Sequence, residues 1–138
     1  MNASTQIQRL GLGGFNGNAA SQTVYDARIV GETTGDAGAG SWFLTNIARS
    51  VGWHKGTIVV GAPLGDNTNP VDFYIDNLPA LIGKNSKTAF GYNVLEFNTN
   101  FGSLTGYFDE ATFSSIPEPS AVVLLVIGLA TAGARRRR

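Results

Sequence analysis

The stretch VDFYID, residues 71–76, alternates apolar and polar side chains with a period of two. In a β-strand successive side chains point to opposite faces, so Val71, Phe73 and Ile75 would share one face. The three polar or aromatic residues between them would share the other face. The pattern therefore predicts a β-strand with one face directed at a core.

Similar segments lie on both sides of this stretch, separated by turn residues at short spacings. Repetition of this kind is the expected signature of an all-β sandwich or barrel. Pro79 has no backbone N–H to donate, so a strand that contains it is confined to a sheet edge. The expected strands cover residues 23–30, 41–48, 52–60, 71–76, 78–82, 93–98 and 105–113.

The composition excludes several classes of function. The chain has no cysteine, which rules out disulfides, thiolate metal sites and cysteine nucleophiles. Residues 1–116 carry nine acidic and six basic side chains, a net charge near minus three. Binding to nucleic acid would require clustered Lys and Arg on one face, so a nucleic-acid partner is disfavoured.

The last residues of the chain combine three features in order. A polar, helix-breaking motif comes first, an uncharged apolar run at residues 121–134 follows, and four arginines end the chain. As a helix the apolar run would span roughly 21 Å, less than a hydrocarbon core of about 30 Å. Ser120, snorkelling of the arginine stems and local bilayer thinning can make up the difference. The tail therefore predicts a marginal transmembrane helix, with a buried C-terminal helix or strand as the alternative.

The arginines also predict an orientation. A cationic cluster beside a membrane segment stays cytoplasmic, which would leave residues 1–120 outside. The predicted motif consists of Pro117, Glu118 and Pro119. The predicted anchor comprises Ala121, Val122, Val123, Leu124, Leu125, Val126, Ile127 and Leu129, and the predicted cytoplasmic cluster comprises Arg135, Arg136, Arg137 and Arg138.

With these parts in order, residues 116–138 resemble the PEP-CTERM sorting signal of Gram-negative bacteria. The resemblance implies recognition by an exosortase, a membrane-embedded, cysteine protease-like sorting enzyme. It also implies an exported protein associated with exopolysaccharide and biofilm. The expected location is the membrane, with the body on the extracytoplasmic side, and the cell surface or the extracellular space after processing.

Residues 1–18 do not resemble the signal peptide that such carriers normally have. A signal peptide needs a cationic start, an apolar stretch of about 7 to 15 residues and a small-residue cleavage site. Arg9 is the only charged side chain here, and a glycine-rich patch follows at residues 10–14. The expectation is a C-terminal fragment or a misplaced start.

The body itself resembles the second half of a concanavalin A-like, LamG-type jelly roll. The resemblance rests on Arg49, on Gly52, Trp53 and His54, and on Val71, Phe73, Tyr74, Ile75, Asp76 and Asn77. It implies an all-β, jelly-roll-type β-sandwich, incomplete because a full jelly roll needs more strands. The expected organisation is an irregular glycine-rich segment at residues 1–21, a β-sandwich at 22–113, and the sorting signal with its linker, apolar helix and arginines at 114–138.

Three aromatic residues are candidates for glycan binding. Trp53 and His54 adjoin at the start of an expected strand, where they could stack on a sugar ring or bond its hydroxyls. Tyr74 is a third candidate. The favoured interpretation nevertheless places Trp53 in the core and makes His54 a structural histidine, because no catalytic partner motif accompanies this single histidine.

Carboxylates of the body do not form a glycosidase pair. Asp72 and Asp76 would lie about 13 Å apart on one strand face, whereas retaining glycosidases place their carboxyl groups about 5 to 5.5 Å apart. The Glu-x-Asp-x-x-Glu strand motif of glycosidases with this fold is absent. Asp76 is expected to cap a hairpin turn with Asn77, and the body is expected not to be an enzyme.

Two weak candidates for a calcium site remain. Asp66 lies in an oxygen-rich loop with Asn67 and Asn69, and Asp109 precedes Glu110 in the last expected strand. Ca²⁺ needs about six to eight oxygen ligands, and a lone Asp-rich loop is usually a turn. No metal or other cofactor is therefore assigned, with calcium as the alternative.

Taken together, the sequence predicts an exported, exosortase-sorted surface or matrix protein whose β-sandwich body binds exopolysaccharide. The expected partners are the exosortase, the membrane and the polysaccharide. Two alternatives stay open. The chain could be the C-terminal fragment of a glycan-active enzyme, or the body could be a purely structural adhesion module.

Overall fold

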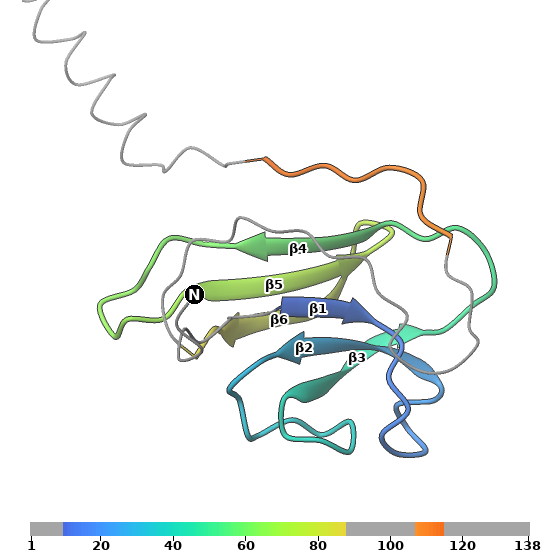
Figure 1. Cartoon of the computed structure of the whole chain (residues 1–138), viewed down its shortest axis with the longest axis horizontal. Coiled ribbons are helices and arrows are strands. Elements are labelled where there is room, and N and C mark those ends of the chain that lie inside the picture. Colours follow the sequence, from blue (N-terminus) through green and yellow to red (C-terminus); the bar gives the residue numbers. More distant parts are fainter. Residues whose placement is uncertain (1–9, 88–106, 115–138) are drawn as a thin grey trace, which may run out of the picture. The chain divides into compact units, whose positions relative to one another are not determined.

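The computed structural model describes residues 10–87 and 107–114 (Figure 1). The chain divides into two units, Met1–Tyr92 and Asn93–Arg138. The described part of the first unit is all-β, without a helix, and the described part of the second, residues 107–114, has neither helix nor strand. The strands are β1 (Leu10–Gly13), β2 (Val24–Ile29), β3 (Trp42–Ala48), β4 (Gly56–Val60), β5 (Pro70–Ile75) and β6 (Leu78–Asn85).

The six strands form two antiparallel sheets. One has the order β1-β2-β3 and the other β4-β5-β6, so within the described residues each strand pairs with its neighbour along the chain. In Figure 1 β4 and β5 of the second sheet lie above β2 and β3 of the first. Each sheet is a simple meander, in which short connections join antiparallel neighbours.

One core joins the two sheets. Phe73 and Val71 of β5 are fully buried, and they belong to the same cluster as Ala27 and Ile29 of β2 and Phe43 of β3. Leu10, Leu12 and Leu81 are partly buried against this cluster. Burial of one large apolar side chain contributes about 1.5 to 3 kcal/mol, so the shared core is the main term that holds the sheets face to face.

The alternating stretch behaves as predicted. Val71, Phe73 and Ile75 are buried, whereas Asp72 and Tyr74 between them are only half-buried. The strands expected at residues 23–30, 41–48, 52–60 and 78–82 are also present as β2, β3, β4 and β6, although β4 begins only at Gly56. The strand with Pro79, β6, ends the sheet order of the described residues, as predicted for an edge.

Three expectations about strands had other outcomes. The segment expected to be irregular, 1–21, contains β1, whose Leu10 and Leu12 face the core while Gly11 lies against Arg28. The strand expected at 105–113 is wrong for residues 107–113, which form no strand. The strand expected at 93–98 lies outside the described residues. The prediction of a jelly roll likewise concerns strands outside the described residues.

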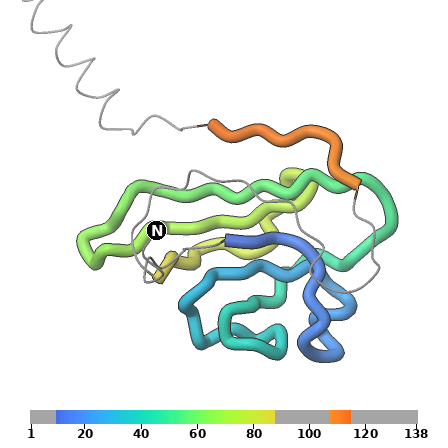
Figure 2. Tube along the Cα trace, viewed as in Figure 1, coloured from blue at the N-terminus to red at the C-terminus, as the bar shows by residue number. Residues whose placement is uncertain are grey.

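The loops before and after β2 pack against each other (Figure 2). An added Cβ at Gly17 would lie 2.1 Å from the backbone oxygen of Ala37, closer than any real contact. Gly38 adopts a φ of 98°, a backbone conformation that favours glycine. Glycine at these two positions therefore allows the two loops to come into contact.

No helix among the described residues is long and apolar enough to cross a membrane. The predicted anchor at residues 121–134 lies outside the described residues, together with the rest of the segment 115–138. The transmembrane helix and its orientation therefore stay predictions.

Candidate functional site

The connection from β3 to β4 carries the most exposed aromatic side chain of the first unit's described part. Trp53 is 70% exposed, and Val51, two residues earlier, is fully exposed. The expectation that Trp53 belongs to the core is wrong. The reason is that β4 begins only at Gly56, so Trp53 lies in the loop before the strand and not on its inner face.

The neighbouring residue, His54, is held on both ring nitrogens. Its Nδ1 lies 2.7 Å from Oδ2 of Asp76, and its Nε2 lies 3.0 Å from Oγ of Ser50. The ring also makes an edge contact with Tyr25 of β2, with centroids 5.6 Å apart and planes at 61°. We call Ser50, His54 and Asp76 the histidine cluster.

Asp76 belongs to the two-residue turn between β5 and β6. Asp76 and Asn77 have φ values of 52° and 65°, and Ile75 pairs with Leu78 across the turn. Left-handed backbone at both central residues is what a type I′ hairpin turn requires, and Asp and Asn tolerate it better than most residues. The predicted hairpin turn at Asp76 and Asn77 is confirmed.

The turn is also tied to the start of β4. The backbone N–H of Asp76 donates to the carbonyl oxygen of Lys55 at 2.9 Å, and Oδ1 of Asp76 accepts from the N–H of Lys55 at 2.8 Å. Hydrogen bonds from His54 and then from Lys55 lower the pKa of the Asp76 carboxyl below its usual value. The carboxylate is thus ionised near neutral pH and fixed in position by two partners.

Sequence reasoning does not identify Ser50. The signal available was weak, a serine four residues before the single histidine in a segment that is not helical. What brings the cluster together is the register of the β4-β5 pair, in which Gly56 pairs with Ile75. This register places the residues just before β4 beside the turn that follows β5.

The geometry of the cluster allows one chemical role for each group. An ionised carboxylate can only accept, so Oδ2 of Asp76 accepts a hydrogen bond from the N–H at Nδ1 of His54. In the neutral imidazole Nε2 is then an acceptor, and it faces the hydroxyl of Ser50. This is the order of contacts of a serine, histidine and aspartate triad, which is recognised by geometry and not by sequence position.

Tyr74 does not join this cluster. It pairs with Thr57 of β4 and with Pro79 of β6, on the face of the sheet opposite Phe73. Among the described residues no hydrogen bond or ring contact links Tyr74 to Trp53 or His54. Trp53, His54 and Tyr74, the three candidate glycan-binding residues, therefore do not form one contacting group within the described residues.

The two carboxylates proposed for calcium belong to different units, Asp66 to the first and Asp109 to the second. Oδ1 of Asp66 accepts from the N–H and the hydroxyl of Thr68, at 3.1 and 2.7 Å, which closes a local turn. Asp109 is exposed in the second unit. Within residues 10–87 and 107–114, no three His, Cys, Asp or Glu side chains are grouped to hold a metal ion.

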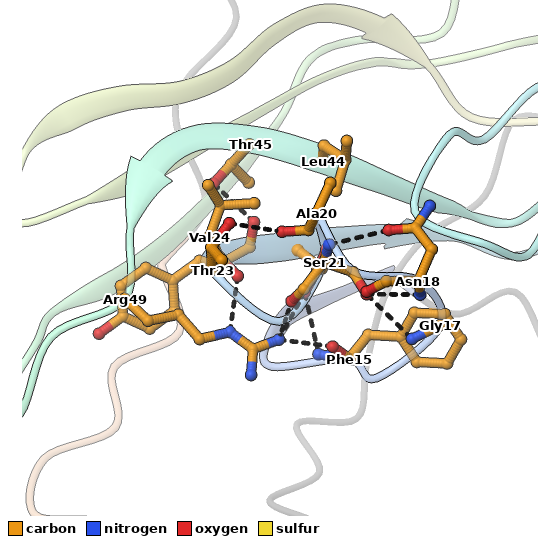
Figure 3. Close-up of polar contacts among 12 residues, drawn as sticks. Phe15, Gly17, Asn18, Ala20, Ser21, Thr23, Val24, Leu44, Thr45 and Arg49 are labelled. Carbon is orange, nitrogen blue, oxygen red and sulfur yellow. Dashed lines mark hydrogen bonds and ion pairs between the residues drawn. The ribbon is translucent and has the colours of Figure 1, made fainter.

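A second polar cluster surrounds Arg49 and is shown in Figure 3. Arg49 donates to Oδ2 of Asp26 at a distance of 2.9 Å. Its guanidinium also donates to three backbone carbonyl oxygens, those of Val24, Phe15 and Ser21. Asp26 is fully buried, and burial raises its pKa although the N–H of Phe15 and the guanidinium oppose the shift. All of these partners are structural groups of the loop and sheet, so this cluster fastens the loop before β2.

Comparison with known protein families bears on the other end of the chain. Residues 115–138 match the PEP-CTERM protein-sorting motif. The predicted sorting signal is confirmed, and the matched range contains Pro117, Glu118, Pro119 and the four terminal arginines. The motif implies export, anchoring in the membrane and processing by an exosortase.

The matched motif covers only the tail. No curated protein matches the chain, and no solved structure matches it. The resemblance of the body to concanavalin A-like domains therefore has no support from relatives, and the use of the body has to be argued from its own surface.

Proposed function

We propose that this chain is a surface protein sorted through its PEP-CTERM motif, whose β-sheet body binds extracellular polysaccharide. The motif at residues 115–138 supports the first part, because carriers of this signal are exported and processed by an exosortase. The resemblance to this class of sorting signal associates its carriers with exopolysaccharide, which is why this ligand is proposed for the body. Polysaccharide binding by the body requires a surface that fits a sugar.

The observation that carries the second part is the exposed indole of Trp53. A large apolar side chain that is 70% exposed loses contact with water only when a partner covers it. Sugar rings present flat C–H faces that can stack on an aromatic ring. Trp53 therefore offers a platform for one or two sugar units of a chain.

Polar groups next to the platform can fix the orientation of a sugar. The side chains of His54 and Asp76 are 24% and 46% exposed, so part of each remains accessible beside Trp53. The hydrogen bonds of Asp76 to Lys55 and His54 hold this loop before any ligand arrives. A preorganised loop loses less conformational freedom on binding, which favours affinity.

We expect the full-length chain to bind exopolysaccharide purified from an exosortase-bearing host, and Trp53→Ala to weaken binding about tenfold or more. The reason is that loss of an aromatic anchor commonly costs about 2 kcal/mol, where about 1.4 kcal/mol is a factor of ten. The measurement is titration of labelled protein with the polysaccharide, complemented by a glycan array.

Phe113→Ala is the matched control, because Phe113 is also an exposed aromatic side chain, at 68%, but belongs to the second unit. Loss of binding only in Trp53→Ala supports the proposal. Equal binding of both variants, or no binding by folded wild-type protein, contradicts it and leaves the structural adhesion module as the better account.

A further inference from the structure

The histidine cluster has a second possible use, which does not depend on glycan binding. The sequence predicted a body without enzymatic activity and a structural His54, for which no catalytic partner motif was found. The fold supplies two partners, with Ser50 Oγ 3.0 Å from Nε2 and Asp76 Oδ2 2.7 Å from Nδ1. Both distances lie within the hydrogen-bond range that links nucleophile, base and orienting group. We propose that Ser50 is a nucleophile for carboxylic esters, with His54 as its general base.

Access to the reacting atoms is open. Ser50 lies in an exposed loop, and Gly52 follows it at a φ of 142°. A Cβ at position 52 would lie 3.9 Å from Nε2 of His54, its nearest heavy atom outside the chain neighbours. Because glycine has no side chain there, the approach to Nε2 and to the serine hydroxyl is not covered by residue 52.

The backbone after Ser50 provides candidate donors for an oxyanion. In many hydrolases the N–H of the residue after the nucleophile stabilises the developing negative charge. Among the hydrogen bonds of the described residues, none uses the N–H of Val51 or of Gly52. Both groups are therefore available to a carbonyl oxygen bound at Ser50.

The reaction balances without a cofactor. Ser50 Oγ forms a bond to the acyl carbon as its proton passes to His54 Nε2, and the ester C–O bond breaks as that proton passes to the leaving alcohol. Water then attacks the acyl-serine, losing a proton to Nε2, which returns it to Oγ as the acid leaves. The sum is ester plus water giving acid and alcohol. Asp76 takes no proton and acts as a positioning residue for the imidazole.

The surroundings favour small substrates and slow turnover. The side chain of Asp76 is 46% exposed, so water screens its interaction with the imidazole more than in a buried triad. Trp53 precedes the base in the sequence, and its indole is 70% exposed, so no deep pocket for a long acyl chain is formed by this side chain. The structure thus fits short-chain esters, such as acetyl groups on alcohols, better than long acyl chains or amides.

The test uses the full-length chain, a serine-directed fluorophosphonate probe and p-nitrophenyl acetate. We expect the probe to modify Ser50, located by peptide mass spectrometry, and the wild-type protein to hydrolyse the ester faster than buffer alone. Ser50→Ala is expected to abolish both signals, and His54→Gln to lower both about a hundredfold, the low end of general-base contributions.

Ser114→Ala is the matched control, since Ser114 is exposed and outside the cluster, and it is expected to leave both signals unchanged. The Asp76→Asn variant adds a readout for positioning, because it should lower the rate while the fold remains intact by circular dichroism. Labelling absent from Ser50, or equal in wild type and His54→Gln, overturns the proposal. Neither the probe nor the ester contains a sugar, so this outcome is independent of polysaccharide binding.

Discussion

Asp76 shows how one side chain can serve both structure and site. Its left-handed backbone forms half of the β5-β6 turn, its Oδ1 accepts from Lys55, and its Oδ2 faces His54. Asp suits all three roles, because it tolerates positive φ and offers two acceptor oxygens. A change at this position therefore affects the loop that carries Trp53 as well as the turn.

The lowered pKa of Asp76 gives a pH-dependent contribution to stability. A carboxyl group whose pKa is lower in the folded protein stabilises the fold above its ordinary pKa of 3.8, and this contribution is lost as pH falls through the folded value. We expect Asp76→Asn to be less stable than wild type near about pH 6, and the difference to be smaller near about pH 3, as the pH approaches the lowered pKa of Asp76 and the carboxylate begins to be protonated. Urea unfolding at both pH values measures the difference, and the same difference at both would contradict the role of the charge.

The candidate site was only partly predictable at this scale. The turn at Asp76 and Asn77 followed from local backbone preferences of these two residue types. The exposure of Trp53 did not, because burial depends on where β4 begins. Ser50 was missed because a serine–histidine contact becomes a candidate site only when a carboxylate binds the other ring nitrogen. That carboxylate is Asp76, 22 residues after His54 in the sequence.

Among the structural elements, the loop before β2 depends most on one side chain from another segment. Arg49 reaches it from the end of β3 and pairs with the fully buried Asp26. Removal of one partner from a buried ion pair is strongly destabilising because the remaining charge is left without compensation. The ion pair between Arg49 and Asp26 therefore holds this loop in place in addition to apolar packing.

We expect Arg49→Met to lower the free energy of unfolding by about 3 kcal/mol, the low end of the range for buried pairs because the guanidinium is one-third exposed. Chemical denaturation measures the loss. Addition of Asp26→Asn to Arg49→Met should recover part of it, since the amide carries no charge but can still accept from Phe15.

Arg28→Met is the control for this prediction. The guanidinium of Arg28 lies 5.3 Å from the ring centroid of Trp42, and no ion pair of Arg28 occurs within the described residues. Its replacement should cost about 0.5 to 1 kcal/mol. A loss in Arg49→Met no larger than in the control, or no recovery in the double variant, would contradict the account.

Strands were predicted correctly where apolar and polar residues alternate and the apolar ones have large side chains. β5 alternates cleanly and its apolar face is buried, whereas in β1 the alternating partners of Leu10 and Leu12 are glycines, which suggest a turn. Residues 107–113 contain aromatic side chains but pair with no strand within the described residues. Local β preference alone does not supply the partner strand that a sheet requires.

On the scale of the whole molecule, the chain combines a C-terminal sorting motif with a folded β-sheet body. The tail carries a sorting motif that its sequence alone reveals, because an exosortase signal is a linear pattern. The body carries a surface that only the fold reveals, because Trp53 and the histidine cluster depend on strand pairing. Residues 115–138 therefore carry the sorting motif, and the loop around Trp53 is the proposed binding site.

The central claim, sorting through the tail, is tested most directly by following the chain, with a secretory signal peptide added before Met1 and with an internal tag, in hosts with and without an exosortase. We expect the exosortase-bearing host to process the chain and to display the tagged body at the surface. Replacement of Pro117, Glu118 and Pro119 by alanine should leave the chain unprocessed in the membrane, while the control Pro63→Ala should be processed like wild type. Identical mass and location of wild type and triple variant, or of wild type in the two hosts, would contradict the claim.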